Sequence, residues 1–126
     1  MSYDLAVFDP AAAPGDDAAF VAWYRHQTTW SEPHGYDDPQ VSTPALRAWF
    51  EEMIQAFPPM NGPLASADAG DPMTTDYSVG RTLIYAAFAW SVAAQAHEAM
   101  RRLAEVHGVG FFDVSGDGEV WRPPPR

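Results

Sequence analysis

The chain has 126 residues, a common size for a single domain, and 47% of them are hydrophobic, including five Trp, seven Phe and five Tyr. It contains no cysteine, which excludes disulfides, thiolate metal ligands and a cysteine nucleophile. Seventeen acidic residues oppose seven basic ones, all arginine, and give a net charge of −10. Such a charge disfavours binding to nucleic acid and to anionic membranes.

The first residues predict a strand in a cytoplasmic protein. Tyr3, Leu5 and Val7 alternate with Asp4, Ala6 and Phe8, which matches the two-residue period of a strand. The N-terminus carries acids where a signal peptide has a basic segment, and no small-residue cleavage site follows an apolar run. The longest uncharged apolar stretch, 82–95, has about 14 residues and is too short to span a bilayer.

Two helices are predicted in the first half of the chain. The first covers about 18–28, with Asp16 or Asp17 as its cap, and an irregular loop follows over 31–42. The second begins at Pro44, after an N-cap at Thr43. One apolar stripe follows at helical spacing and predicts a core-facing helix, which Pro58-Pro59 ends: Leu46, Trp49, Phe50, Met53, Ile54 and Phe57.

A second long loop, 61–75, leads into a predicted pair of strands at 76–79 and 82–90. The second of these strands is apolar on both faces, which is typical of a central strand. A last helix is predicted from a cap at Ser91 to His107, and Gly108 is well placed as its left-handed stop.

The end of the chain predicts a closing hairpin, 109–114 and 119–121, in a single domain over 1–121, with a flexible C-terminal tail at 122–126. The order β-α-α-β-β-α-β-β predicts an α+β fold, in which three helices cover one face of a mostly antiparallel sheet of four or five strands. If the segment from 82–90 to 109–114 is a parallel crossover, the nearest named architecture is ferredoxin-like.

No catalytic site, metal site or cofactor is predicted. The chain has no lysine, no nucleophile elbow and four scattered histidines: His26, His34, His97 and His107. Acidic residues crowd around His34, but their spacing matches no known frame of metal ligands, and acids beside Gly and Pro are ordinary turn residues.

The two long loops are the predicted partner-binding site, because each mixes acidic residues with aromatic residues or methionine. Such a surface would select a basic protein partner. The predicted residues are Trp30, Glu32, His34, Tyr36, Asp37 and Asp38 in the first loop and Asp68, Asp71 and Asp76 in the second. In the alternative interpretation, Trp30 and Tyr36 fold back and fill the edge of the core.

Several motifs spread over nearly the whole chain resemble those of a family of small, stand-alone bacterial proteins. These motifs are M-S-Y-D-L-A-V-F-D (1–9), F-V-A-W-Y-x-x-Q-T-x-W-S-E (20–32), T-P-A-L-R-A-W-F-x-E-M-I (43–54), F-P-P-M-N-G-P (57–63), T-D-Y-S-V-G (75–80), I-Y-A-A-F-A-W-S (84–91) and H-G-V-G-F-F-D-V-S (107–115). Relatives beginning M-S-(F/Y)-D-L are similar to immunity proteins of interbacterial toxin systems. The resemblance implies a class of function and brings no catalytic residues with it.

The favoured hypothesis is a non-enzymatic binding protein, in its most concrete form an immunity or antitoxin-type inhibitor of a basic toxin. One alternative is a small enzyme or ligand-binding module with a pocket between sheet and helices, with His26, His34, Tyr85 and a loop carboxylate as candidates. A second alternative is a subunit of a homo-oligomer, with exposed Trp residues at the interface.

Overall fold

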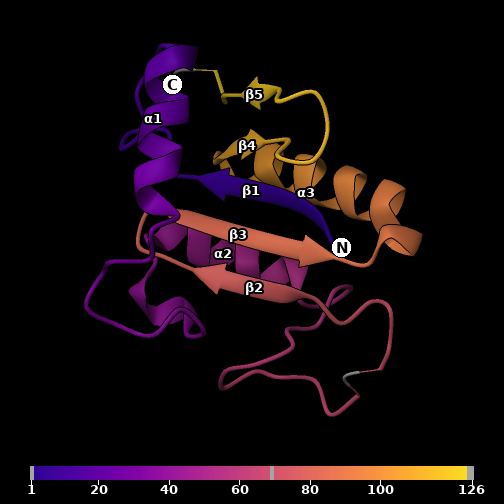
Figure 1. Ribbon diagram of the computed structural model, residues 1–126. Helices are drawn as coiled ribbons and strands as arrows, with labels where there is room; N and C mark the ends of the chain where they lie inside the picture. The colour runs from indigo at the N-terminus through magenta and orange to yellow at the C-terminus, as the bar shows by residue number, and fades with distance from the viewer. Residues whose placement is uncertain (1, 69, 125–126) are drawn as a thin grey trace.

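The computed structural model describes residues 2–68 and 70–124 and confirms an α+β fold with an antiparallel sheet (Figure 1). Its five strands lie in the order β2-β3-β1-β4-β5, and every neighbouring pair is antiparallel. The elements are β1 (Tyr3–Phe8), α1 (Asp17–Gln27), the 3₁₀ turn η1 (Pro39–Val41), α2 (Pro44–Met53), β2 (Asp76–Val79), β3 (Leu83–Phe88), the 3₁₀ turn η2 (Trp90–Val92), α3 (Ala93–His107), β4 (Gly110–Phe112) and β5 (Val120–Trp121).

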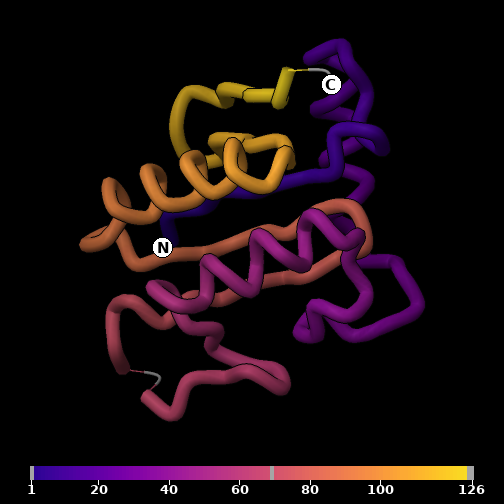
Figure 2. The backbone as a smooth tube through the Cα atoms, turned by 180° about the vertical axis from the view of Figure 1, so that it is seen from behind, coloured from indigo at the N-terminus to yellow at the C-terminus, as the bar shows by residue number. Residues whose placement is uncertain are grey.

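The central part of the fold has the ferredoxin-like arrangement. β1, α2, β2, β3, α3 and β4 follow one another as β-α-β-β-α-β, and their strands lie in the order β2-β3-β1-β4. β3 and β4 both run antiparallel to β1, so they are parallel to each other. They lie on either side of β1, and α3 connects them. Seen from behind, α2 and α3 lie side by side across the same face of the sheet (Figure 2). β5 and α1 are additions to this core.

The face of the sheet under α2 and α3 is closed by apolar side chains. Leu5 and Val7 of β1 point into this layer, and both are fully buried. Trp49 of α2 is also fully buried, and its indole Nε1 donates a hydrogen bond to the Met100 carbonyl of α3 at 3.4 Å. The space between the sheet and these two helices is therefore filled by side chains.

The prediction that all three helices cover one face is wrong, because α1 lies on the opposite face. Ala6 and Phe8 alternate with Leu5 and Val7 along β1, so they point away from α2 and α3. Phe20 of α1 packs on Phe8, with ring centroids 4.7 Å apart. The sheet thus carries apolar residues on both faces near the end of β1. α2 and α3 cover one face, and α1 covers the other.

Two predicted helix ends are confirmed. Asp16 caps α1, and its Oδ2 accepts a hydrogen bond from the Ala19 amide at 2.9 Å. Gly108 ends α3 with φ 68°, a left-handed conformation that glycine adopts without steric cost.

The predicted start of the last helix is wrong. Ser91 lies within η2, and α3 begins at Ala93 without a side-chain cap. β3 ends at Phe88, before the predicted Trp90. Thr43 is at the N-cap of α2 as predicted, but its side chain makes no capping hydrogen bond. Among the described residues, no helix is both long and apolar enough to cross a membrane.

Arg122, the first residue of the expected tail, contacts α1 and the segment before it. Its Nη1 donates to Asp17 Oδ1 at 3.0 Å, and its Nη2 donates to the Pro14 carbonyl at 3.2 Å. The expected tail also includes 125–126, which lie outside the described residues.

Gly110 of β4 lies against the Phe8 ring, where a Cβ would come within 2.2 Å of Cζ. We expect Gly110→Ala to lower the free energy of unfolding by about 1–3 kcal/mol, because a packed core accommodates an extra methyl only with strain. Gly15→Ala is the matched control, since a Cβ there would meet nothing within 4 Å. Urea unfolding measures both variants, and equal midpoints would contradict the close packing of Phe8 on Gly110.

Candidate functional site

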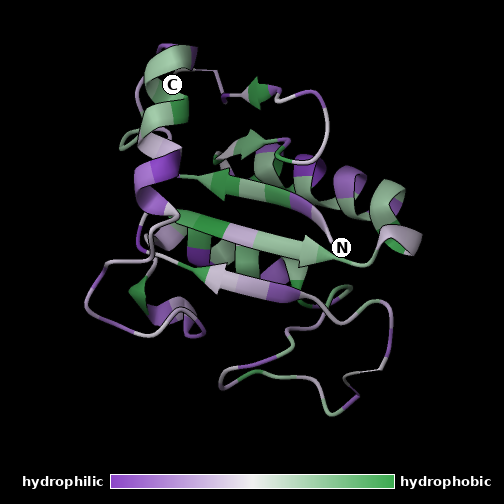
Figure 3. Ribbon diagram, viewed as in Figure 1, coloured by the Kyte–Doolittle hydropathy of each residue, from purple (hydrophilic) through white to green (hydrophobic). Residues whose placement is uncertain are grey.

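The face of the sheet that carries α1 is open at its other end. Asp4 of β1 and Asp76 of β2 both pair with Ala87 of β3, so the three residues form one row across the sheet. Cross-strand partners share a face, and three neighbouring strands span about 10 Å. The starts of β1 and β2 are accordingly hydrophilic beside the end of β3 (Figure 3).

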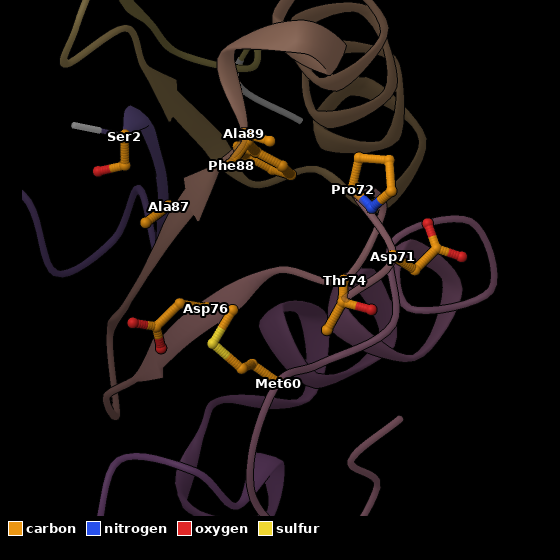
Figure 4. A pocket seen from close by; sticks show the side chains of 9 residues that line it. All are labelled: Ser2, Met60, Asp71, Pro72, Thr74, Asp76, Ala87, Phe88 and Ala89. Atoms are coloured by element: carbon orange, nitrogen blue, oxygen red, sulfur yellow. The ribbon is translucent and has the colours of Figure 1, made fainter. Parts of the chain in front are cut away.

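A groove of about 530 Å³ continues from this row towards the loop before β2. Its lining comes from the residue before β1, from the segment between α2 and β2, from the start of β2, and from the end of β3 with the residue after it (Figure 4). The lining residues are Ser2, Met60, Asp71, Pro72, Thr74, Asp76, Ala87, Phe88 and Ala89. The groove thus combines two carboxylates with an apolar floor. We call the surface formed by Asp4, Asp71, Asp76 and Ala87 the acidic face.

Of the predicted site residues in the second loop and directly after it, Asp71 and Asp76 line the groove and Asp68 does not. Asp71 Oδ1 accepts a hydrogen bond from the Met73 amide at 2.9 Å, which fixes the loop next to the groove. Asp68 is in an exposed turn, where its Oδ1 accepts from the Gly70 amide at 3.2 Å.

Trp30 and Tyr36 of the first loop are half-buried and fold back onto the protein. The ring centroid of Trp30 lies 5.0 Å from that of Tyr36 and 6.2 Å from that of Tyr85 on β3. The Tyr36 carbonyl accepts a hydrogen bond from the Val79 amide at 2.8 Å, so this loop also pairs with the edge strand β2. These contacts agree with the alternative interpretation of the two aromatic residues.

The two long loops touch each other at Asp37. Gly62 has φ +89°, and a Cβ on it would lie 2.2 Å from the Asp37 carbonyl oxygen, so only glycine fits this contact. The Asp37 side chain is exposed, whereas Asp38 caps η1 through a 3.0 Å bond from the Gln40 amide to its Oδ1.

Glu32 and His34 form an internal latch between the first loop and the turn after β2. Glu32 Oε1 accepts hydrogen bonds from the Arg81 amide at 3.0 Å and from His34 Nε2 at 2.5 Å. His34 Nδ1 lies 2.6 Å from the Gly35 carbonyl oxygen. Both acceptors lack a proton, so only the doubly protonated imidazolium satisfies both contacts. The Gly35 carbonyl and then Glu32 raise the pKa of His34, while burial and then the charge of Arg81 oppose them.

This latch predicts a pH-dependent contribution to stability. A raised pKa in the folded state means that His34 stabilises the protein below the ordinary histidine pKa of about 6.5, and that this contribution disappears as the pH rises through the folded-state value. We expect the loss of stability caused by His34→Asn to be larger at pH 5.5 than at pH 8.5. Urea unfolding of both proteins at the two pH values measures it, and a constant difference would contradict the latch.

Sequence reasoning missed the contribution of β1 and β3 to the acidic face. Asp4 interrupts an otherwise apolar central strand, which was the available signal. Tyr85, a candidate of the enzyme or ligand-binding alternative, donates a hydrogen bond from its hydroxyl to Asp4 Oδ2. His26, another such candidate, is exposed on α1.

Within 2–68 and 70–124, no three His, Asp or Glu side chains form a group that could hold a metal ion. The row of Asp4 and Asp76 and the groove beside it offer carboxylates and apolar surface at one place. No family model matches this chain, and no curated protein or solved structure matches it either.

Proposed function

We propose that this protein is a non-enzymatic binding domain whose acidic face binds a basic segment of a protein partner. Its most concrete form is an inhibitor of the immunity or antitoxin type. The observation that carries the proposal is the position of Asp71 and Asp76 in the lining of one groove, with Asp4 in the same cross-strand row as Asp76. Three carboxylates on one surface attract a cationic segment and disfavour an anionic one.

The carboxylates of the acidic face are available to a partner. Among the described residues, the five ion pairs involve Glu32, Glu52, Glu105, Asp17 and Asp113, and none includes a carboxylate of this face. The described lining of the groove contains no arginine that could neutralise Asp71 or Asp76 from within. A basic segment would therefore supply the missing charge.

The groove also offers apolar contact area. Met60 lines it and is 44% exposed. Methionine is enriched in protein interfaces.

A second copy of the chain fits the acidic face poorly. In a two-fold interface, the same patch meets itself, so carboxylates of one copy would approach those of the other. Like charges at close range are destabilising, whereas a cationic partner removes the repulsion. Light scattering of the purified protein tests for self-association, and a stable dimer lost on mutation of this face would favour the homo-oligomer alternative.

Partner capture with two matched variants tests the proposal. Asp71→Asn with Asp76→Asn removes two charges from the groove, and Glu51→Gln with Glu98→Gln removes two from the exposed sides of α2 and α3. The immobilised proteins are exposed to lysate of the source organism at 50 and 500 mM salt. We expect a basic protein to be retained at low salt by the wild type and the helix variant only. Equal retention by both variants would overturn the proposal.

A further inference from the structure

The Asp4 carboxylate is half-buried and surrounded by hydroxyl groups. Its Oδ1 accepts a hydrogen bond from Ser2 Oγ at 2.6 Å, and its Oδ2 accepts one from the Tyr85 hydroxyl. No arginine or histidine of the described chain lies within ion-pair distance of it. Carboxylates withdrawn from water are usually paired with a cation, and each carboxylate oxygen here still has an unused lone pair.

Aromatic residues lie on the same face of the sheet as this carboxylate. Tyr85 contacts it directly, and Trp30 packs edge-on against Tyr85. Tyr24 of α1 packs edge-on against Phe112, the cross-strand partner of Ala6. Burial and then Asp4 raise the pKa of Tyr24 to about 12, and the same two causes raise the pKa of Tyr85. Both phenols therefore stay neutral at physiological pH, so Asp4 carries the only negative charge of this group of four.

The backbone holds Asp4 in a fixed position. Its amide donates a hydrogen bond to Ser115 Oγ at 2.8 Å, and its carbonyl accepts one from the Ser115 amide at 3.0 Å. On the other side of β1, the antiparallel pairing with Ala87 of β3 fixes the backbone of Asp4. A carboxylate held in this way needs little reorganisation to receive a ligand.

We propose that Asp4, Tyr24, Trp30 and Tyr85 form a subsite for one arginine side chain of the basic segment. This inference rests on the proposed function and names the residue that the segment places at the start of β1. A guanidinium donates to a carboxylate and also stacks on aromatic rings, and it is more weakly hydrated than a lysine ammonium. The charge of Asp4 together with three aromatic rings matches both properties.

The distance between Asp4 and the groove residue Asp76 further defines the basic segment. Asp4 and Asp76 lie on opposite sides of Ala87, about 10 Å apart across the sheet. In an extended segment, residues i and i+2 point to the same side about 7 Å apart, and arginine side chains are long enough to reach the remaining distance. Adjacent residues point to opposite sides. The segment therefore carries arginines at i and i+2.

Peptide titration tests this subsite. The probe is an extended, otherwise neutral peptide with arginines at i and i+2, and the control peptides have them at i and i+1 or have one replaced by citrulline. We expect the i, i+2 peptide to bind about tenfold more tightly than either control, an effect that corresponds to about 1.4 kcal/mol. Asp4→Asn should abolish this advantage without changing the melting temperature, because asparagine still accepts the Tyr85 hydrogen bond.

The outcomes separate the subsite from the proposed function. If Asp4→Asn and citrulline each weaken binding and their effects do not add, the two groups contact each other. If the effects add, the subsite is wrong, and binding that still depends on Asp71 and Asp76 leaves the proposed function standing. Ala87→Lys places a cation in the row without altering either acid, and we expect it to block the i, i+2 peptide. Unchanged binding by this variant would also overturn the subsite.

Discussion

Phe8→Ala is expected to lower the free energy of unfolding by about 3–5 kcal/mol, the usual cost of removing a fully buried aromatic side chain. The Phe8 ring contacts Phe20 and Trp23 of α1 and covers Gly110 of β4. Its loss leaves a cavity between α1 and the sheet. Hydrogen exchange should show α1 losing protection before the strands do.

Two comparisons make this test specific. Val106→Ala, at a position that is 61% exposed, should change stability by no more than about 0.5 kcal/mol. Gly110→Ala should become harmless in the Phe8→Ala background, because its methyl group then enters the space that the ring occupied. Simple addition of the two costs would contradict the close packing of the Phe8 ring on Gly110.

The second large effect concerns binding. Neutralising Asp71 and Asp76 together should weaken the affinity for the captured partner at least about tenfold at low salt, since each carboxylate loses a charged contact. Glu51→Gln with Glu98→Gln should leave the affinity nearly unchanged. Titration calorimetry at 50 and 500 mM salt measures both, and the difference between the variants should shrink at high salt, where charges are screened. Equal weakening by both variants would show that net charge alone matters.

Local chemistry made much of the fold predictable. Asp16 and Gly108 have side-chain and backbone properties that define helix ends, and both act as predicted. The face that α1 covers was not predictable in this way, because helical periodicity shows which side of a helix is buried but not what it packs against. Phe8 was the informative residue. Because successive side chains of a strand point to opposite faces, a large aromatic residue next to Val7 implied that both faces of β1 are covered.

The candidate site was predictable only where it is local in sequence. Asp71 lies in the second loop and Asp76 follows it directly at the start of β2, and the composition of this short stretch identified both. Asp4 and Tyr85 are 81 positions apart and meet only through the register of β1 with β3, which composition does not reveal. Glu32 belonged to the predicted site for its charge, but its hydrogen bonds to Arg81 and His34 point it inward.

Mapping the contact surface by NMR tests the central claim most directly. The ¹⁵N-labelled protein is titrated with the i, i+2 arginine peptide, and the shifts of the backbone amides are followed. The acidic face predicts the largest shifts at 2–6, 71–78 and 85–89, with small changes along α2 and α3. Shifts concentrated on the outer sides of α2 and α3, with the strands unaffected, would contradict it.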